Sequence, residues 1–185
     1  MADLKIWIAN LAKSPDLTDD VMINVSNILR GYYQQCTANT DTNFVDVFPL
    51  YTRDSYSASE TDLLIYIVAS FSSSVLKKFD PTLNGGGDIG GNTSWKPEVG
   101  ATLAASEIYL DVVKARCADL GGGLANMIFH ETMHNKANLG DDVHTKGGGG
   151  LAGEKVRDSD SINDGNVSYM KAVIGNQTKQ WDLGF

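Results

Sequence analysis

Residues 125–134 read ANMIFHETMH, an apolar run that ends in the pattern His-Glu-x-x-His. In an α-helix, residues four positions apart lie on one face, so His130 and His134 are expected to point the same way. Two imidazoles in this arrangement can share one zinc ion, and Glu131 beside them can take up a proton. The stretch therefore predicts a helix that carries two metal ligands and a general base.

A third histidine, His144, follows ten residues after His134, and the chain contains no further histidine. A lone histidine next to apolar residues is usually a core residue, but here all three lie within one window of fifteen residues. This clustering favours a metal site with His144 as the third ligand, because imidazole is the commonest zinc-binding side chain. The alternative third ligands are Glu154 and an aspartate, Asp141 or Asp142.

Composition excludes several classes of partner. Of 185 residues, 42% are hydrophobic and 21% are charged, and the net charge is −8. Such an acidic chain is not expected to bind nucleic acid or an anionic membrane. No apolar stretch reaches the roughly twenty residues that a membrane span needs. The length is that of one domain, residues 1–185, with a core of its own.

The N-terminus and the cysteines bear on location. Residues Met1–Ile8 lack the basic and long apolar regions of a secretory signal peptide. The default expectation is the cytoplasm, with leaderless secretion or delivery as an effector as the alternatives. Cys36 and Cys117 are the only cysteines, and we expect two unpaired thiols that are not metal ligands.

Periodic apolar patterns predict the elements that surround the histidine helix. A helix is expected from Thr18 to about Cys36, with Thr18 or Asp19 as its N-cap. The glycine-rich segment Asp80–Asn92 is expected to be a loop that borders a cleft. Strands are expected at Leu4–Ala9, Asn43–Tyr51, Thr61–Ala69 (an inner strand) and Ala104–Val113.

Stop signals divide the rest of the chain. Asn138-Leu139-Gly140 is a typical end for the histidine helix. The four glycines Gly147–Gly150 exclude a regular element at that point. One further helix is expected near Tyr169–Ile174.

The predicted order of strand, helix, three strands and a His-Glu-x-x-His helix resembles the upper half of the metzincin clan of zinc peptidases. His130, Glu131 and His134 match the core motif of that clan. The motif continues with a glycine and a third ligand histidine, the places that Gly140 and His144 would take. The gap between the second and third histidines is ten residues here, longer than the clan's six.

The resemblance implies an α+β fold of zincin or metzincin type, a mixed twisted sheet with a backing helix and an active-site helix. It implies one catalytic domain over residues 1–185, with an upper lobe at 1–140 and a small lower lobe at 141–185. Ser168-Tyr169-Met170 resembles the clan's methionine turn, which would place Met170 beneath the metal.

A second resemblance is to gluzincins such as the thermolysin-like peptidases, whose third ligand is a glutamate on a later helix. Glu154 lies twenty residues after His134, a spacing similar to theirs. Asp158, four residues further on, would be placed to orient a ligand histidine.

The expected function is that of a zinc metalloendopeptidase acting on a protein or peptide substrate. Three protein ligands leave one zinc position open for a water molecule, which the metal activates and Glu131 deprotonates. Tyr169 is a candidate hydrogen-bond donor to the oxyanion. The alternatives are a zinc amidase acting on a cell-wall or other non-protein amide, and a non-catalytic zinc-binding interaction module. No cofactor besides Zn²⁺ is expected.

Overall fold

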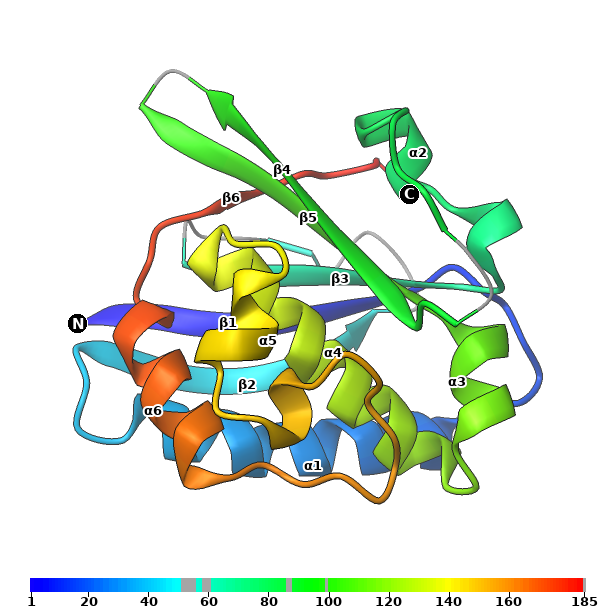
Figure 1. Ribbon diagram of the computed structural model, residues 1–185, viewed down its shortest axis with the longest axis horizontal. Coiled ribbons are helices and arrows are strands. Elements are labelled where there is room, and N and C mark those ends of the chain that lie inside the picture. Colours follow the sequence, from blue (N-terminus) through cyan, green and yellow to red (C-terminus); the bar gives the residue numbers. More distant parts are fainter. Residues whose placement is uncertain (51–55, 58–60, 86–87, 99, 185) are drawn as a thin grey trace.

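The computed structural model describes residues 1–50, 56–57, 61–85, 88–98 and 100–184. Within them, a six-stranded sheet is combined with six α-helices, as Figure 1 shows. The strands are β1 (Ala2–Asn10), β2 (Thr42–Leu50), β3 (Leu63–Val68), β4 (Gly91–Glu98), β5 (Ala101–Tyr109) and β6 (Lys179–Gln180). The α-helices are α1 (Asp19–Thr37), α2 (Leu76–Phe79), α3 (Leu110–Arg116), α4 (Leu120–Ala137), α5 (Asp142–Lys146) and α6 (Asp164–Val173). Two short 3-10 helices are η2 (Phe71–Ser73) and η3 (Gly150–Ala152).

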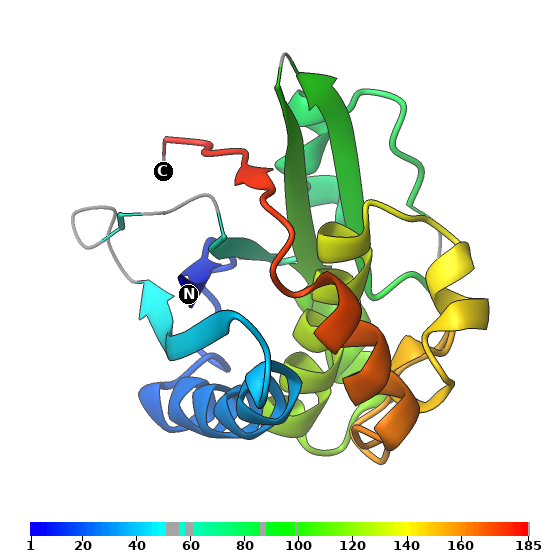
Figure 2. The same cartoon turned by 90° about the vertical axis from the view of Figure 1, so that its left-hand side faces the viewer.

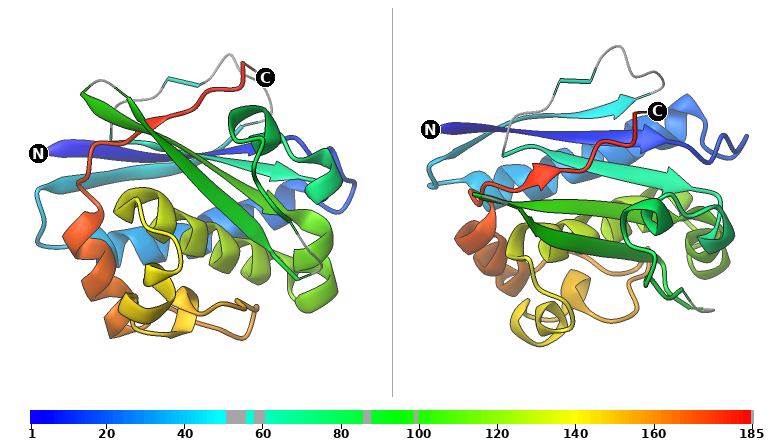
Figure 3. Two further views of the ribbon diagram at one scale, coloured as in Figure 1. Left: turned by 45° about the horizontal axis from the view of Figure 1, so that its top comes forward. Right: turned by 90° about the horizontal axis from the view of Figure 1, so that it is seen from above.

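The sheet is mixed but mostly parallel. Its strand order is β2-β1-β3-β5-β4, and only β4 runs antiparallel to its neighbour, β5. Strand β6 pairs in parallel with the first half of β5, where Figure 3 shows it crossing the sheet. All six side chains of β3 are buried, as expected of an inner strand.

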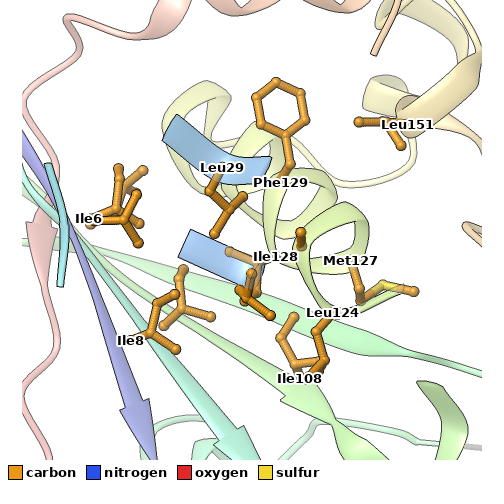
Figure 4. Packing of buried hydrophobic residues seen from close by; sticks show 14 of the residues in the cluster. Ile6, Ile8, Leu29, Ile108, Leu124, Met127, Ile128, Phe129 and Leu151 are labelled. Atoms are coloured by element: carbon orange, nitrogen blue, oxygen red, sulfur yellow. The ribbon is translucent and has the colours of Figure 1, made fainter. Parts of the chain in front are cut away.

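Alternate side chains of the strands build two cores on opposite faces of the sheet. From β1, Leu4, Ile6 and Ile8 join the larger core, which α1 and α4 cover (Figure 4). Trp7 and Ala9 point to the other face and pack in a smaller core with α2 and the C-terminal segment. Figures 1 and 2 show α1, α4 and α6 together on one side of the sheet.

Helix α1 confirms the helix expected from Thr18 to about Cys36. The Thr18 side chain accepts a hydrogen bond from the backbone N–H of Val21, and Asp19 and Asp20 lie in the first turn, where negative charge is favourable. The Tyr33 hydroxyl donates to Thr132 Oγ1 over 2.7 Å and fastens α1 to α4. This bond holds the backing helix against the helix that carries the histidines.

Helix α4 is buried along nearly its whole length. A Cβ atom at Gly121 or Gly123 would collide with the side chains of Asn24 or Cys117, so glycine lets α1 and α3 approach its first turn. It ends where expected, because Asn138 takes the left-handed conformation at φ 51°. Cys36 is buried and Cys117 half-buried, and both are free thiols. Among the described residues, no helix is both long and apolar enough to cross a membrane.

The structure differs from the sequence-based expectations in several elements. Strand β4 begins inside the segment expected to be loop up to Asn92. The expected strand Ala104–Val113 ends at Tyr109, because Leu110 and Val113 enter the core from a helix, α3. Helix α6 begins at Asp164, earlier than expected, because Asn163 and Asn166 form a capping box. Strand β6, in the segment 141–185 expected to form the small lower lobe, pairs with β5 of the sheet.

Candidate metal centre

Three imidazoles from two helices meet at one point. His130 and His134 lie one turn apart on α4, and His144 comes from the short helix α5. Their ligand atoms all lie within 4.8 Å of one another, and the Nε2 atoms of His130 and His134 are 3.2 Å apart. His130 and His134 are buried and His144 is half-buried. In the part of the chain that the structure describes, this is the one group of His, Cys, Asp or Glu side chains that could hold a metal ion.

Each of the three rings is held by a backbone carbonyl at its other nitrogen. Nδ1 of His130 lies 2.7 Å from the Leu151 oxygen, Nδ1 of His134 lies 2.9 Å from the Leu139 oxygen, and Nδ1 of His144 lies 2.9 Å from the Ala152 oxygen. A carbonyl oxygen can only accept, so each Nδ1 carries the proton. In its neutral form, each ring with this proton at Nδ1 presents an unprotonated Nε2 with its lone pair free.

This arrangement fits a metal ion better than any contact between the rings themselves. Two unprotonated Nε2 atoms cannot hydrogen-bond to each other, so the 3.2 Å approach of His130 and His134 is repulsive without a cation between them. Zinc–nitrogen bonds of 2.0–2.1 Å arranged as a tetrahedron place two ligand atoms about 3.4 Å apart. The 3.2 Å between the Nε2 atoms of His130 and His134 is close to that value.

Burial favours the neutral form of His130 and His134, which is the form that binds a metal. Burial, together with the neighbouring His134, lowers the pKa of His130 to about 3. Burial also lowers the pKa of His134, against the opposing effect of the Leu139 carbonyl. At neutral pH, neither ring has to lose a proton before it coordinates an ion.

Glu131 lies beside the three imidazoles with its carboxylate held by strand β4. The Thr93 hydroxyl donates to Glu131 Oε2 over 2.7 Å. The side chain is almost fully buried, and burial raises its pKa to about 7, although the Thr93 hydrogen bond and the nearby His144 act in the opposite direction. A carboxyl group with a pKa near neutrality can both accept and return a proton.

The raised pKa predicts how the stability of the metal-free protein varies with pH. Folded Glu131 holds its proton up to about pH 7, whereas an unfolded glutamate releases it near 4.5. The wild type should therefore lose about 3 kcal/mol of stability relative to Glu131→Gln as pH rises from 4.5 to 7, and no more above pH 7. Chemical denaturation of both metal-free proteins across this range measures the difference. A difference that does not vary with pH would show that the carboxyl group titrates normally.

The histidines and Glu131 line a cleft of about 300 Å³. The glycine-rich loop borders it, as expected, through Asp88–Gly90, and residues 86–87 of that loop lie outside the described part of the chain. Apolar side chains from four elements or loops complete the walls: Ile89, Trp95, Met127 and Val156. Apart from the histidines, the ionisable lining residues are all acidic: Asp88, Glu131, Asp141 and Glu154.

The alternative third ligands lie elsewhere. Glu154 and Asp141 line the cleft but are exposed and outside the three-histidine group. Asp142 pairs with Lys146 at 2.7 Å. Asp158 accepts a hydrogen bond from the backbone N–H of Asp119 and orients no ligand histidine in the structure. The geometry therefore favours His144 as the third member of the group.

The methionine-turn segment has a different structure from the one that the resemblance implies. Ser168, Tyr169 and Met170 lie inside helix α6, so they do not form a turn. Met170 is fully buried in the larger core, and Tyr169 packs against the same core. Tyr169 is not among the residues that line the cleft, which removes the support for its role as an oxyanion donor.

Sequence reasoning missed the groups that hold the three histidines and Glu131 in place. Three of them are the backbone oxygens of Leu139, Leu151 and Ala152, and no side-chain pattern can reveal a backbone contact. The fourth is Thr93, whose strand was not expected. The glycines around residue 150 were a signal of a tight turn near the site, but not of its purpose.

No family model matches the chain, and no curated protein or solved structure matches it either.

Proposed function

We propose that the protein is a zinc-dependent hydrolase of peptide bonds, a metalloendopeptidase of zincin type. The observation that carries this proposal is the convergence of the imidazoles of His130, His134 and His144, each held at Nδ1 by a backbone carbonyl, next to the buried carboxyl group of Glu131. Three protein ligands are typical of catalytic zinc, whereas structural zinc usually has four. When bound, zinc would act as a Lewis acid on water and on the substrate carbonyl.

The chain's own residues supply positioning and proton transfer. Glu131 takes the proton of the attacking water and returns it to the leaving amine. Thr93 fixes the Glu131 carboxylate, and the three backbone carbonyls fix the rings. These groups are in place before substrate binds, which is the condition for efficient catalysis.

The arrangement of elements supports a zincin-like fold as part of the same proposal. A mixed sheet is covered on one face by a backing helix, α1, and by α4, which carries His-Glu-x-x-His. The departures are the ten-residue gap before His144 and the helical position of Met170. We therefore propose a zincin-like enzyme without assigning it to a known clan.

Two features of the cleft support a peptide as the substrate. Strand β4 forms one wall and is the last strand of the sheet order, so its outer edge has no strand partner among the described residues. An extended peptide can pair with such an edge. Because the charged lining residues are acidic, we propose that segments carrying Lys or Arg bind better than acidic ones.

Metal analysis and a cleavage assay test the proposal together. The purified protein should contain about one zinc per chain, and it should cleave casein and a panel of basic, neutral and acidic peptides in the zinc-loaded but not the chelated form. Zinc without cleavage of any peptide, but with release of cell-wall or other non-protein amides, would favour the amidase. Zinc without any hydrolysis would favour the interaction module.

Strand β4 approaches Glu131 so closely that Gly91 leaves no room for a side chain. A Cβ atom there would lie 2.8 Å from Glu131 Cγ and Oε1 and 2.8 Å from the Glu107 backbone oxygen. We expect Gly91→Ala to displace the carboxylate and to lower kcat on the order of a hundredfold, with zinc still bound. Gly140→Ala is the matched control, because Gly140 also lines the cleft and its Cβ would be 3.8 Å from Trp95. Equal activity of the two variants would contradict the role given to Gly91.

A further inference from the structure

A tight turn after α5 supplies two of the three carbonyls that orient the imidazoles. We define the glycine turn as residues Gly147–Ala152. Its Leu151 oxygen accepts from His130 on α4, and its Ala152 oxygen accepts from His144 on α5. Rings from two different helices are therefore fixed by adjacent residues of one turn. His134 is held separately, by the Leu139 oxygen at the end of its own helix.

Within the glycine turn, the Ala152 N–H donates to the Gly149 oxygen at 3.0 Å, but the four glycines have no side chains that could hold its shape. Gly148, Gly149 and Gly150 have φ values of 84°, 69° and 54°, which glycine adopts without strain. Glycine also costs the most conformational entropy to order, so a run of glycines needs external contacts to keep one shape. Those contacts come from two sides: Leu151 and Ala152 are buried in the larger core, and the N-terminus of α6 contacts the backbone of the glycines.

Asn166 makes three side-chain hydrogen bonds to the glycine turn and is fully buried. Its Nδ2 donates to the Gly147 oxygen at 2.7 Å and to the Gly149 oxygen at 2.6 Å. Its Oδ1 accepts from the backbone N–H of Leu151 at 3.2 Å, the residue whose oxygen holds His130. The same Oδ1 completes the capping box with Asn163, and Asn163 Nδ2 donates to the Gly148 oxygen at 3.1 Å.

Backbone packing strengthens this contact. A Cβ atom at Gly148 would lie 2.6 Å from the Gly165 Cα, and one at Gly165 would lie 2.9 Å from the Gly148 Cα. The glycine turn thus lies directly on the first turn of α6, backbone against backbone. Loss of the Asn166 amide would leave the Gly147 oxygen and the Leu151 N–H without this partner, whereas the Gly149 oxygen would keep the Ala152 N–H.

We propose that Asn166 is a positioning residue of the metal centre, which acts through the glycine turn to fix the orientation and tautomer of His130 and His144 but not of His134. The proposal rests on the proposed function in one respect, that these histidines are metal ligands. It makes α6, which contributes no ligand, part of the metal centre. Outer partners of this kind typically change metal affinity by 10- to 100-fold.

The first test reads the tautomers by ¹⁵N NMR of the imidazoles in the metal-free protein. In the wild type, all three neutral rings should be protonated at Nδ1. In Asn166→Ala, His130 and His144 should lose this preference, whereas His134 should keep it. If all three rings keep the Nδ1 proton, or all three lose it together, the proposal is overturned.

The second test measures zinc affinity by competition with a chelator. Asn166→Ala should bind zinc at least about tenfold more weakly than the wild type. Asn126→Ala is the matched control: Asn126 is equally buried and donates to the Arg157 and Asp160 oxygens, which hold no imidazole. We expect its zinc affinity to stay within about threefold of the wild type. Equal losses in the two variants would reduce Asn166 to a general role in stability.

If Asn166→Ala does not fold, Asn166→Asp takes its place. The aspartate keeps the acceptor for Leu151 and for the capping box but presents an oxygen to the carbonyls of Gly147 and Gly149. It should show the same tautomer change and loss of affinity, and wild-type behaviour would overturn the proposal. Because the tautomers are read without metal, failure of this inference is distinguishable from failure of the wild type to bind zinc.

Discussion

Glu131→Gln is expected to lower the rate of peptide cleavage at least about a thousandfold and to leave zinc binding unchanged. A general base contributes typically 10²- to 10⁴-fold, and glutamine has the size of glutamate but cannot take a proton. Glu131 touches the site through its carboxylate alone, with Thr93 as its hydrogen-bond partner, and it is not a member of the three-ligand group. The measurements are kcat/KM for a cleaved peptide and the zinc content of the same sample.

The matched control for this prediction is Glu154→Gln, which removes another carboxylate from the lining of the same cleft. Glu154 is exposed, so its loss should change KM for basic peptides and leave kcat within a few-fold of the wild type. If Glu131→Gln retained more than about a tenth of the activity, another group would have to be the base. If Glu131→Gln also lost its zinc, Glu131 would contribute to metal binding, and its assignment as a base alone would be wrong.

Much of the fold could be predicted because its signals are local. The alternation in β1, the helical period and Thr18 cap of α1, and the apolar run of β3 each fix the structure of their own segment. Strand β4 has no such signal. Its residues are mostly polar, Pro97 lies within it, and it is a strand because β5 pairs with it at the edge of the sheet. Pairing of this kind depends on the partner strand.

The end of β5 shows a second limit of pattern reading. Leu110 and Val113 are buried, as a strand reading of Ala104–Val113 requires, but they reach the core from α3. Apolar residues three apart fit a helix and a twisted strand end about equally well over so short a segment. The point at which the chain leaves the sheet is decided by tertiary packing.

The candidate site divides along the same line. His130, Glu131 and His134 were found from the motif, and the meeting of His130 and His134 on one face of α4 agrees with the prediction. The return of His144 over ten residues depends on α5 and on the glycine turn, whose support comes from α6. The sequence suggested His144 because the chain has only three histidines. The backbone path that brings His144 back to the other two depends on contacts with distant residues such as Asn166.

His144→Ala carries the second large effect, because it removes one of three ligands. Zinc sites with four protein ligands bind with about 10–16 kcal/mol, or roughly 3 kcal/mol for each ligand, so the loss of one should weaken binding at least about a hundredfold. His144 is half-buried on the short helix α5, and its side chain has one hydrogen bond to the protein, to Ala152. Its removal should therefore cost the fold little. Chelator competition and thermal unfolding, with and without zinc, measure the two effects separately.

The controls for His144→Ala are Glu154→Gln and Asp141→Asn, which replace the competing candidates for the third ligand. Both carboxylates line the cleft, yet neither belongs to the group whose ligand atoms lie within 4.8 Å of one another. Each variant should bind zinc within about threefold of the wild type, since an exposed carboxylate at the cleft surface is screened by solvent and changes the local potential only modestly. If Glu154→Gln lost zinc affinity a hundredfold and His144→Ala kept full affinity, the third ligand would be Glu154, a glutamate as in gluzincins. The glycine turn would then hold His144 for another purpose.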